Sequence, residues 1–522
     1  MTMQDAALSP AAPTPVPGRR AVAVNLLLVL LSAGLTALAF PPCEVWPLAW
    51  VALAPLLFAL RRTATVRAAG WLMLLWGLLV ATAALHWMAA IFSTAAVGVF
   101  LLIALPWVLF GLAYRVLIAR AQPTAILLLT PILWLACDWL RCEGWYFQFS
   151  WLQLGFTQVP FHFSQPLFPV VGTYGVTFFI LLVNAALLAV MVGPAQDRKR
   201  FLVREVPLTL LVLALLTAHG YAIRNIQEKF TPTVTTIIVQ DEDNGMDRLK
   251  ALSLAYKKER AGLQTPALLV WPEYAVPGYL LEWKPELAEV QGVARDLHAT
   301  LVLGTKERAP DNAPCDPLRR RSMLLGEGNL FYNTALIVGP DGGIRGKYHK
   351  AHPIQLFADG VPGRDFPAYP TPAGKLGLAI CYDCDFAWPL LQSVRNGANI
   401  LVVPTMDAKS WSDLQHRQHA RMAQARAAEL GRPMARATTS GVSQLLDAQG
   451  EELATIPCGA SQAVVGHLWP QNSMTPYASV FFLLPYACLA VSLLWLLWTA
   501  LALWRIRKNT PVPAGDSPAT AN

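Results

Sequence analysis

Three segments of the chain bring an apolar run up to a residue that can do acid–base or nucleophilic chemistry. The first runs through Leu-Leu-Val-Trp-Pro into Glu273, the second carries the sequence Gly-Lys-Tyr-His-Lys at 346–350, and the third ends in Cys381. A thiolate can attack a carbonyl carbon, a carboxylate can take and return the thiol proton, and an ammonium can stabilise the oxyanion. A nearby lysine also favours an ionised sulfur. The trio therefore predicts covalent catalysis at a carbonyl.

The elements that must position these groups alternate between short β-branched runs and helical stretches. This alternation predicts an α/β layered domain, in which active groups gather at strand ends. Asp341-Gly342-Gly343 and residues 447–450 predict two tight turns. The expected strands are Thr235–Gln240, Ala267–Trp271, Thr300–Gly304, Asn333–Gly339, Leu376–Cys381, Ile400–Pro404 and Ser440–Leu446, and the expected helices are 246–263, 284–298 and 411–430.

The rest of the chain has the composition of a membrane protein. Of its 522 residues 55% are hydrophobic and only 14% charged, where a soluble domain carries about 25% charged residues. This excludes a simple cytosolic enzyme. Apolar stretches of about the length of a membrane span predict eight transmembrane helices, at about 21–40, 46–60, 69–92, 94–118, 124–140, 170–193, 206–222 and 478–504.

Basic residues flank these stretches and predict their orientation. The net charge is +8, but its clusters lie beside apolar runs, which argues for cytoplasmic anchors and against nucleic-acid binding. With the N-terminus inside, every strong basic cluster faces the cytoplasm, and the polar block faces outward. We expect the first helix to stay uncleaved. The expected domains are a disordered tail at 1–20, a membrane domain of seven helices at 21–222, an outward-facing catalytic domain at 223–477, an eighth helix at 478–504 and a cytoplasmic tail at 505–522.

The ordered Glu, Lys and Cys segments resemble the nitrilase, or carbon-nitrogen hydrolase, superfamily. The resemblance rests on Trp-Pro-Glu at 271–273, Lys-Tyr-His-Lys-Ala-His at 347–352 and Gly-Leu-Ala-Ile-Cys-Tyr-Asp at 377–383. Residues 41–50, 151–155 and 419–438 are similar to apolipoprotein N-acyltransferases, the membrane-embedded branch. The resemblance extends from about 21 to 504. It implies an αββα sandwich domain joined to a helical membrane domain, with Glu273 as base, Lys350 rather than Lys347 as the oxyanion-stabilising cation, and Cys381 as nucleophile.

The family resemblance also implies a reaction. Members transfer an acyl chain from a phospholipid, through a cysteine thioester, to the α-amine of a lipidated N-terminal cysteine on a lipoprotein, in a ping-pong sequence. A backbone N–H of Tyr382 is expected to help bind the oxyanion. The resemblance further implies a monomer in the bacterial inner membrane, with its catalytic domain on the periplasmic side, and no cofactor, metal or nucleic acid.

Two carboxylates depart from the family pattern. Asp359 and Asp383 stand where the family has glutamate, and a carboxylate moved by one methylene can misplace a proton or a lysine. These changes leave two alternatives open. One is a membrane-tethered amidase, or an acyltransferase for another amine. The other is a catalytically silent homologue that binds lipid or lipoprotein.

Other candidate sites are better explained structurally. Cys381 and Cys384 form a CxxC without the second half of a zinc site or a thioredoxin context. His416 and His419 lie three apart, but without a zincin motif we expect hydrogen bonding along a helix. The pairs Trp134/Trp139 and Trp145/Trp151 are expected to be interfacial anchors. A Cys315–Cys458 disulfide is an open possibility.

Overall fold

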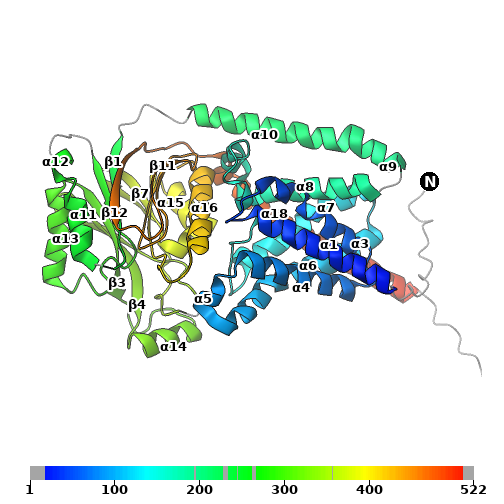
Figure 1. The fold of residues 1–522 in the computed structure, drawn as a ribbon, viewed down its shortest axis with the longest axis horizontal. Helices are drawn as coiled ribbons and strands as arrows, with labels where there is room; N and C mark the ends of the chain where they lie inside the picture. The colour runs from blue at the N-terminus through cyan, green and yellow to red at the C-terminus, as the bar shows by residue number, and fades with distance from the viewer. Residues whose placement is uncertain are drawn as a thin grey trace, which may run out of the picture.

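The computed structural model describes residues 18–192, 195–226, 233–243, 245–260, 266–355 and 357–509. Within these ranges, a bundle of apolar helices adjoins a domain of two packed sheets (Figure 1). Of the expected tails, residues 1–17 and 510–522 lie outside the described residues, whereas Arg19 and Arg20 already belong to the first helix. At the other end, α18 continues to Asn509.

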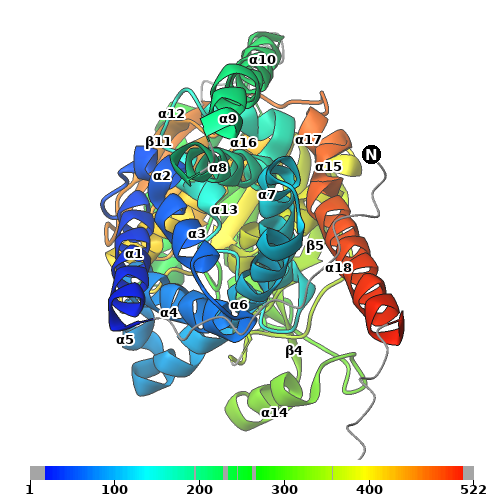
Figure 2. The ribbon, with the colours of Figure 1, turned by 90° about the vertical axis from the view of Figure 1, so that its right-hand side faces the viewer.

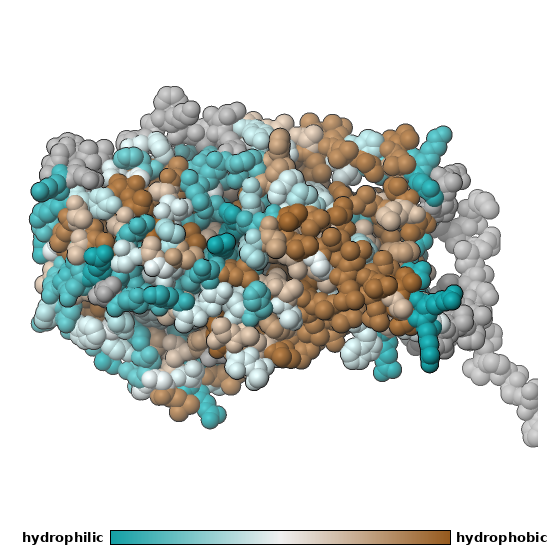
Figure 3. All heavy atoms as spheres, in the orientation of Figure 1, coloured by the Kyte–Doolittle hydropathy of each residue, from teal (hydrophilic) through white to brown (hydrophobic). Residues whose placement is uncertain are grey.

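Seven helices in the described part of the chain are long and apolar enough to cross a membrane. Their surface forms a broad hydrophobic zone over the helical half of the molecule (Figure 3). The expected second span is instead a broken, shorter apolar segment, Trp46–Arg61, made of η1 (Trp46–Leu48), α2 (Ala49–Ala52) and α3 (Ala54–Arg61). The long helices centre on α1 (Arg19–Ala39), α4 (Val66–Ala84), α6 (Ala96–Arg120), α7 (Pro123–Trp139), α8 (Phe168–Val192), α10 (Val206–Ile226) and α18 (Leu484–Asn509).

Close packing of small and aromatic residues holds the bundle together. Figure 2 shows it end-on, with α1 and α18 on opposite sides of α6 and α7. A Cβ added to Gly111 would stand 2.3 Å from the Met73 side chain, so glycine lets α4 and α6 approach closely. Trp76 packs edge-on against both Trp107 and Trp134, at centroid distances of 5.1 and 5.6 Å. Trp134 is therefore a buried core residue, and the expectation of an interfacial anchor is wrong there.

The polar block folds into two six-stranded sheets, in the orders β12-β1-β2-β3-β4-β5 and β11-β10-β9-β8-β7-β6. The first contains β1 (Val234–Gln240), β2 (Ala267–Val270), β3 (Thr300–Arg308), β4 (Phe331–Val338), β5 (Ile344–His349) and β12 (Gln462–Leu468). The second contains β6 (Ala368–Thr371), β7 (Gly374–Leu378), β8 (Ile400–Thr405), β9 (Met434–Thr438), β10 (Ser443–Leu446) and β11 (Glu452–Ile456).

Helices cover the outer face of each sheet, which makes four layers (Figure 1). A continuous apolar core, including Leu268, Val302 and Val402, lies between the sheets. One outer layer holds α11 (Gly245–Leu254) and α13 (Lys284–Asp296), and the other holds α15 (Ala387–Arg395) and α16 (Asp413–Leu430). Helix α16 lies between the sheets and the membrane bundle. The expected αββα sandwich and helical membrane domain are both present.

Candidate active site

Glu273 is the carboxylate of the cluster and follows the end of β2. Pro272 cannot donate to the sheet and ends the strand, so Glu273 emerges into the interior, where it is 1% exposed. Its Oε1 accepts hydrogen bonds from Lys350 Nζ at 2.9 Å and from Asn333 Nδ2 at 2.6 Å. Its Oε2 accepts the Met406 backbone N–H at 2.8 Å. Three donors thus fix the carboxylate in one orientation.

Lys350 lies directly after β5 and is 1% exposed. Its backbone N–H donates to Asn333 O at 2.8 Å. Its Nζ lies between two carboxylates, 2.9 Å from Glu273 Oε1 and 2.8 Å from Asp359 Oδ2. Lys347, by contrast, is half exposed and pairs with Glu307 on the surface. The geometry therefore brings Lys350, rather than Lys347, into the cluster.

Cys381 begins a tight turn, whereas the sequence predicted that a strand would continue to this residue. Strand β7 stops at Leu378, and Cys381 starts the 3₁₀ turn η7 (Cys381–Asp385) at a φ of +48°. Such left-handed conformations are unfavourable for side chains larger than glycine and occur at functional sites held by their surroundings. Its Sγ contacts Met406 O at 3.5 Å. The peptide groups of Met406 therefore connect Cys381 with Glu273.

Burial dominates the electrostatics of these three groups. It raises the pKa of the Cys381 thiol well above its usual range; Glu273 adds to this increase, and Lys350 offsets only part of it. Burial also raises the pKa of Glu273, against the charge of Lys350. For Lys350, burial lowers the pKa, but Asp359 and Glu273 outweigh it and raise the pKa well above normal. The charge of Lys350 therefore favours an ionised sulfur, as expected, while burial and the charge of Glu273 favour the neutral thiol.

The two aspartates that depart from the family pattern both have defined partners. Asp359 binds Lys350 and also accepts hydrogen bonds from Tyr274 Oη at 3.1 Å and the Ile354 N–H at 2.8 Å. Asp383 is fully buried and accepts hydrogen bonds from Tyr348 Oη at 2.9 Å and from the backbone N–H groups of His352 and Ile380, at 2.6 and 3.0 Å. Asp383 therefore ties the segment after Lys350 to the segment before Cys381. The shorter side chains reach their partners here.

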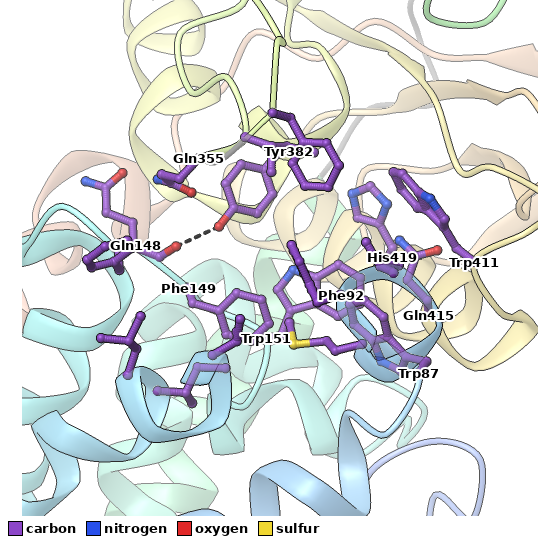
Figure 4. A pocket seen from close by; sticks show the side chains of 18 of the residues that line it. Trp87, Phe92, Gln148, Phe149, Trp151, Gln355, Tyr382, Trp411, Gln415 and His419 are labelled. Carbon is purple, nitrogen blue, oxygen red and sulfur yellow. Dashed lines mark hydrogen bonds between the residues drawn. The ribbon is translucent and has the colours of Figure 1, made fainter. Parts of the chain in front are cut away.

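Cys381 lines two cavities of different character. One, of about 550 Å³, also contains Glu273, Lys350 and Asp359. The other, of about 130 Å³, is predominantly apolar and is bounded by α5 (Met88–Phe92), α6 and the segment 147–151 from the membrane part. Figure 4 shows Phe149 and Trp151 from that part facing Tyr382 and His419 of the sheet domain. The nucleophile therefore lies where a cavity that contains charged side chains meets a predominantly apolar cavity.

The segment 147–151 is held to the sheet domain by hydrogen bonds. Tyr382 Oη donates to Gln148 O at 2.6 Å (Figure 4). The Trp151 indole donates to Asp385 Oδ2 at 2.5 Å, and Ser150 Oγ donates to Asp385 O at 2.9 Å. Trp151 is 6% exposed. It is a cavity wall, so the expectation of an interfacial anchor is wrong for this residue too.

Two contributors to the site were missed from the sequence. Asn333 donates to Glu273 and to Asp359, at 2.6 and 2.9 Å, and so aligns both carboxylates. The available signal was a buried amide near the start of an otherwise apolar strand. Met406 acts through its backbone, where the residue type carries no signal. The cysteines proposed for a disulfide, Cys315 and Cys458, are both free thiols.

An αββα sandwich with buried carboxylate, ammonium and thiol groups at its strand ends, built onto membrane-length helices, defines a membrane-bound protein of the carbon-nitrogen hydrolase class. Comparison with family models supports this assignment. The carbon-nitrogen hydrolase model matches residues 232–466, and the apolipoprotein N-acyltransferase N-terminal domain model matches residues 32–186. The chain belongs to the apolipoprotein N-acyltransferase family.

Similar proteins cover nearly the whole chain. The apolipoprotein N-acyltransferase of Geobacter metallireducens is 26% identical over 508 residues, covering 89% of this chain and 93% of that protein. That of Vibrio vulnificus is 27% identical over 527 residues, covering 91% and 96%. Among solved structures, a carbon-nitrogen hydrolase from Helicobacter pylori G27 covers 46% of this chain and 89% of its own, at 18% identity and a TM-score of 0.37.

Proposed function

We propose that this protein transfers an acyl chain from a phospholipid to the α-amine of the N-terminal diacylglyceryl-cysteine of a lipoprotein. The observation that carries the proposal is the position of Cys381 at the junction of two cavities. An acyl chain suits the apolar cavity bounded by membrane-side residues, and the other cavity contains Glu273 and Lys350, the groups that move protons and stabilise charge. Matching family names over about 90% of the chain support the same reaction.

In the first half-reaction Glu273 accepts the Sγ proton while Cys381 attacks the ester carbonyl of the phospholipid. The C–S bond forms, and the ester C–O bond breaks. The lysophospholipid alkoxide leaves with the proton from Glu273. Lys350 and the backbone N–H of Tyr382 stabilise the oxyanion between these steps.

In the second half-reaction the lipoprotein amine attacks the thioester. Glu273 takes a proton from the amine, the C–S bond breaks, and the sulfur recovers its proton. The same carboxylate and nucleophile serve both halves, which makes the kinetics ping-pong. An apolar, water-poor cavity protects the thioester from hydrolysis between the halves.

The arrangement of basic residues supports a periplasmic position for the sheet domain. The start of α1, the segment α9 (Ala195–Arg200) and the end of α18 all lie at the end of the bundle opposite the sheets (Figure 1). Arg120 occupies the last turn of α6. By the positive-inside rule such basic ends face the cytoplasm, which supports an active site on the periplasmic side of a bacterial inner membrane.

The test is covalent labelling followed by transfer. Purified protein incubated with phospholipid labelled in its acyl chain is expected to retain a hydroxylamine-sensitive label, which Cys381→Ala abolishes and Cys315→Ala preserves. Adding a synthetic diacylated lipopeptide should discharge the label and increase the peptide mass by one acyl group. Absence of a label with every phospholipid tried would refute acyl transfer, and discharge by water alone would favour the amidase alternative.

A further inference from the structure

A second cluster of reactive side chains lies outside the active site, where the start of α16 meets the turn between β11 and β12. Asp413, His416 and Cys458 each present one ligand-type atom there, and these atoms lie within 4.8 Å of one another. Asp413 and His416 lie three residues apart on α16, a spacing that puts both side chains on one helix face. Cys458 comes from a distant part of the sequence. The three residues are not used in the acyl-transfer chemistry.

The imidazole of His416 is already prepared to act as a ligand. It is 1% exposed, and its Nε2 lies 3.1 Å from Ala408 O. A carbonyl only accepts hydrogen bonds, so Nε2 carries the proton and Nδ1 presents a lone pair. Nδ1 is buried and has no hydrogen-bond partner among the described residues. A ring nitrogen whose partner nitrogen donates to a carbonyl is the usual state of a metal-bound histidine.

The cysteine comes from a turn that is held in place. Gln240 Nε2 donates to Pro457 O at 2.8 Å and to Ala460 O at 3.1 Å, and the Gly459 N–H donates to Ser440 O at 2.8 Å. Cys458 is a free, half-buried thiol. Burial and the charge of Asp413 raise its pKa, whereas Arg417 lowers it. A bound divalent cation would replace the thiol proton, as it does at other thiolate sites.

We propose that Asp413, His416 and Cys458 bind a divalent transition metal ion of the zinc type. Thiolate, imidazole and carboxylate are the ligands that Zn²⁺ accepts at about 2.0–2.3 Å, and three protein ligands leave a fourth position for water or an exchangeable ligand. Asp413 is exposed, so the ion can enter from solvent. Closing the ligand atoms from their present spread to a tetrahedral site requires shifts of about 1 Å, which an exposed carboxylate can make.

The site is coupled to the active-site loop through His416. The Ala408 carbonyl that holds its ring is two residues from Met406, whose peptide groups connect Cys381 and Glu273. Trp411 in the same loop lines both cavities. A metal ion would therefore hold the loop 406–412, the start of α16 and the β11–β12 turn together.

The test is a titration of untagged, metal-free protein with Co²⁺, which reports thiolate ligation by a sulfur-to-cobalt charge-transfer band. We expect about one equivalent to bind, with Zn²⁺ displacing it and slowing alkylation of Cys458 at least about tenfold. Cys458→Ser should abolish the charge-transfer band, and His416→Gln, which keeps a donor for the Ala408 carbonyl, should weaken binding at least about tenfold. Losing the hydrogen-bond partner of a metal ligand already costs about 10–100-fold in affinity, so losing a ligand should cost at least as much.

Two matched controls keep the result unambiguous. Cys315→Ser removes another half-exposed cysteine, and Cys381→Ala removes the active-site thiol; both should retain the band. A band that survives in Cys458→Ser, or one lost in Cys381→Ala, would overturn the proposal. Absence of stoichiometric Co²⁺ and Zn²⁺ binding to the folded wild type would also overturn it.

Discussion

The indole nitrogen of Trp151 donates a 2.5 Å hydrogen bond to the Asp385 carboxylate, and this contact joins a wall of the apolar cavity to the turn that carries Cys381. The other Asp385 oxygen lies 3.2 Å from His419 Nε2, and the His419 ring stacks on Trp151. The membrane part and the sheet domain therefore share one polar cluster beside the nucleophile.

Replacing Trp151 by Phe tests this contact. The phenyl ring keeps much of the stacking area, but Asp385 loses a donor in a buried position, which costs about 1–3 kcal/mol. We expect thioester formation to slow about tenfold or more, because about 1.4 kcal/mol in the barrier is a factor of ten. Trp145→Phe is the matched control, since that indole donates to Arg141 O rather than to Asp385. Equal rates for both variants would contradict the expectation.

Lys350→Met should abolish acylation and destabilise the sheet domain. It leaves Glu273 and Asp359 buried without their shared cation, and breaking a buried ion pair costs about 3–5 kcal/mol. Lys347→Met is the control, because its partly exposed pair with Glu307 contributes at most about 1 kcal/mol. Thermal unfolding in detergent, together with the labelling assay, measures both effects. Retained labelling in Lys350→Met would contradict a role for this ammonium.

Asn333→Leu should shift the pH dependence of thioester formation. Acylation needs Glu273 ionised, so its rate rises with pH through the pKa of that carboxyl. Burial raises this pKa, and the hydrogen bond from Asn333 lowers it. Removing the donor therefore moves the acid limb to higher pH. The measurement is the rate of thioester formation over a series of pH values, which gives the midpoint of the acid limb. A lower rate with an unchanged midpoint would indicate a purely structural role for Asn333.

His419 should make the protein less stable at alkaline pH. Burial alone would lower its pKa, but Asp407 and Asp385 outweigh burial and Arg436, and the pKa rises to about 9. A raised folded-state pKa gives stability that is complete below the unfolded value of about 6.5 and is lost as pH rises through 9. The loss amounts to as much as ~3 kcal/mol.

The variant His419→Gln provides the comparison. It should be less stable than the wild type at pH 6. It should also lack the loss of stability between pH 7 and about 9.5 that deprotonation of the imidazolium causes in the wild type. Denaturation curves at several pH values measure this difference. His86→Gln, on an exposed residue, is the control and should follow the wild type. Parallel curves for wild type and His419→Gln would exclude a charged imidazole.

Filling the apolar cavity should select against long acyl chains. Val99 on α6 lines the cavity, so Val99→Trp shortens the space available to a chain. We expect labelling by a long-chain phospholipid to fall about tenfold and labelling by a short-chain one to change little. Val97→Trp, at an exposed position on the same helix, should leave both unchanged. An equal loss for both donors would argue that the chain binds elsewhere.

Much of the fold could be read from local patterns. The length of the apolar stretches located the membrane helices, and the alternation of strand and helix predicted the layers. Both patterns arise because apolar side chains are kept away from water. The segments of Glu273, Lys350 and Cys381 could be recognised because each follows a strand. The structure of segment 46–61 was harder to predict, because the short turns that interrupt it depend on its packing against α8.

Tertiary structure alone decided how these groups act. Whether Cys381 is a thiol or a thiolate depends on burial and on the sum of nearby charges, and no linear pattern records either. Asn333 reaches Glu273 from β4 of the same sheet, and the Met406 backbone reaches it from the other sheet because the two sheets stack face to face. In the same way, the contact of Trp151 with Asp385, 234 residues apart, exists because the helical bundle packs against α16. The order of residues determined which chemical groups are present, and their packing determined the distances and electric fields on which reactivity depends.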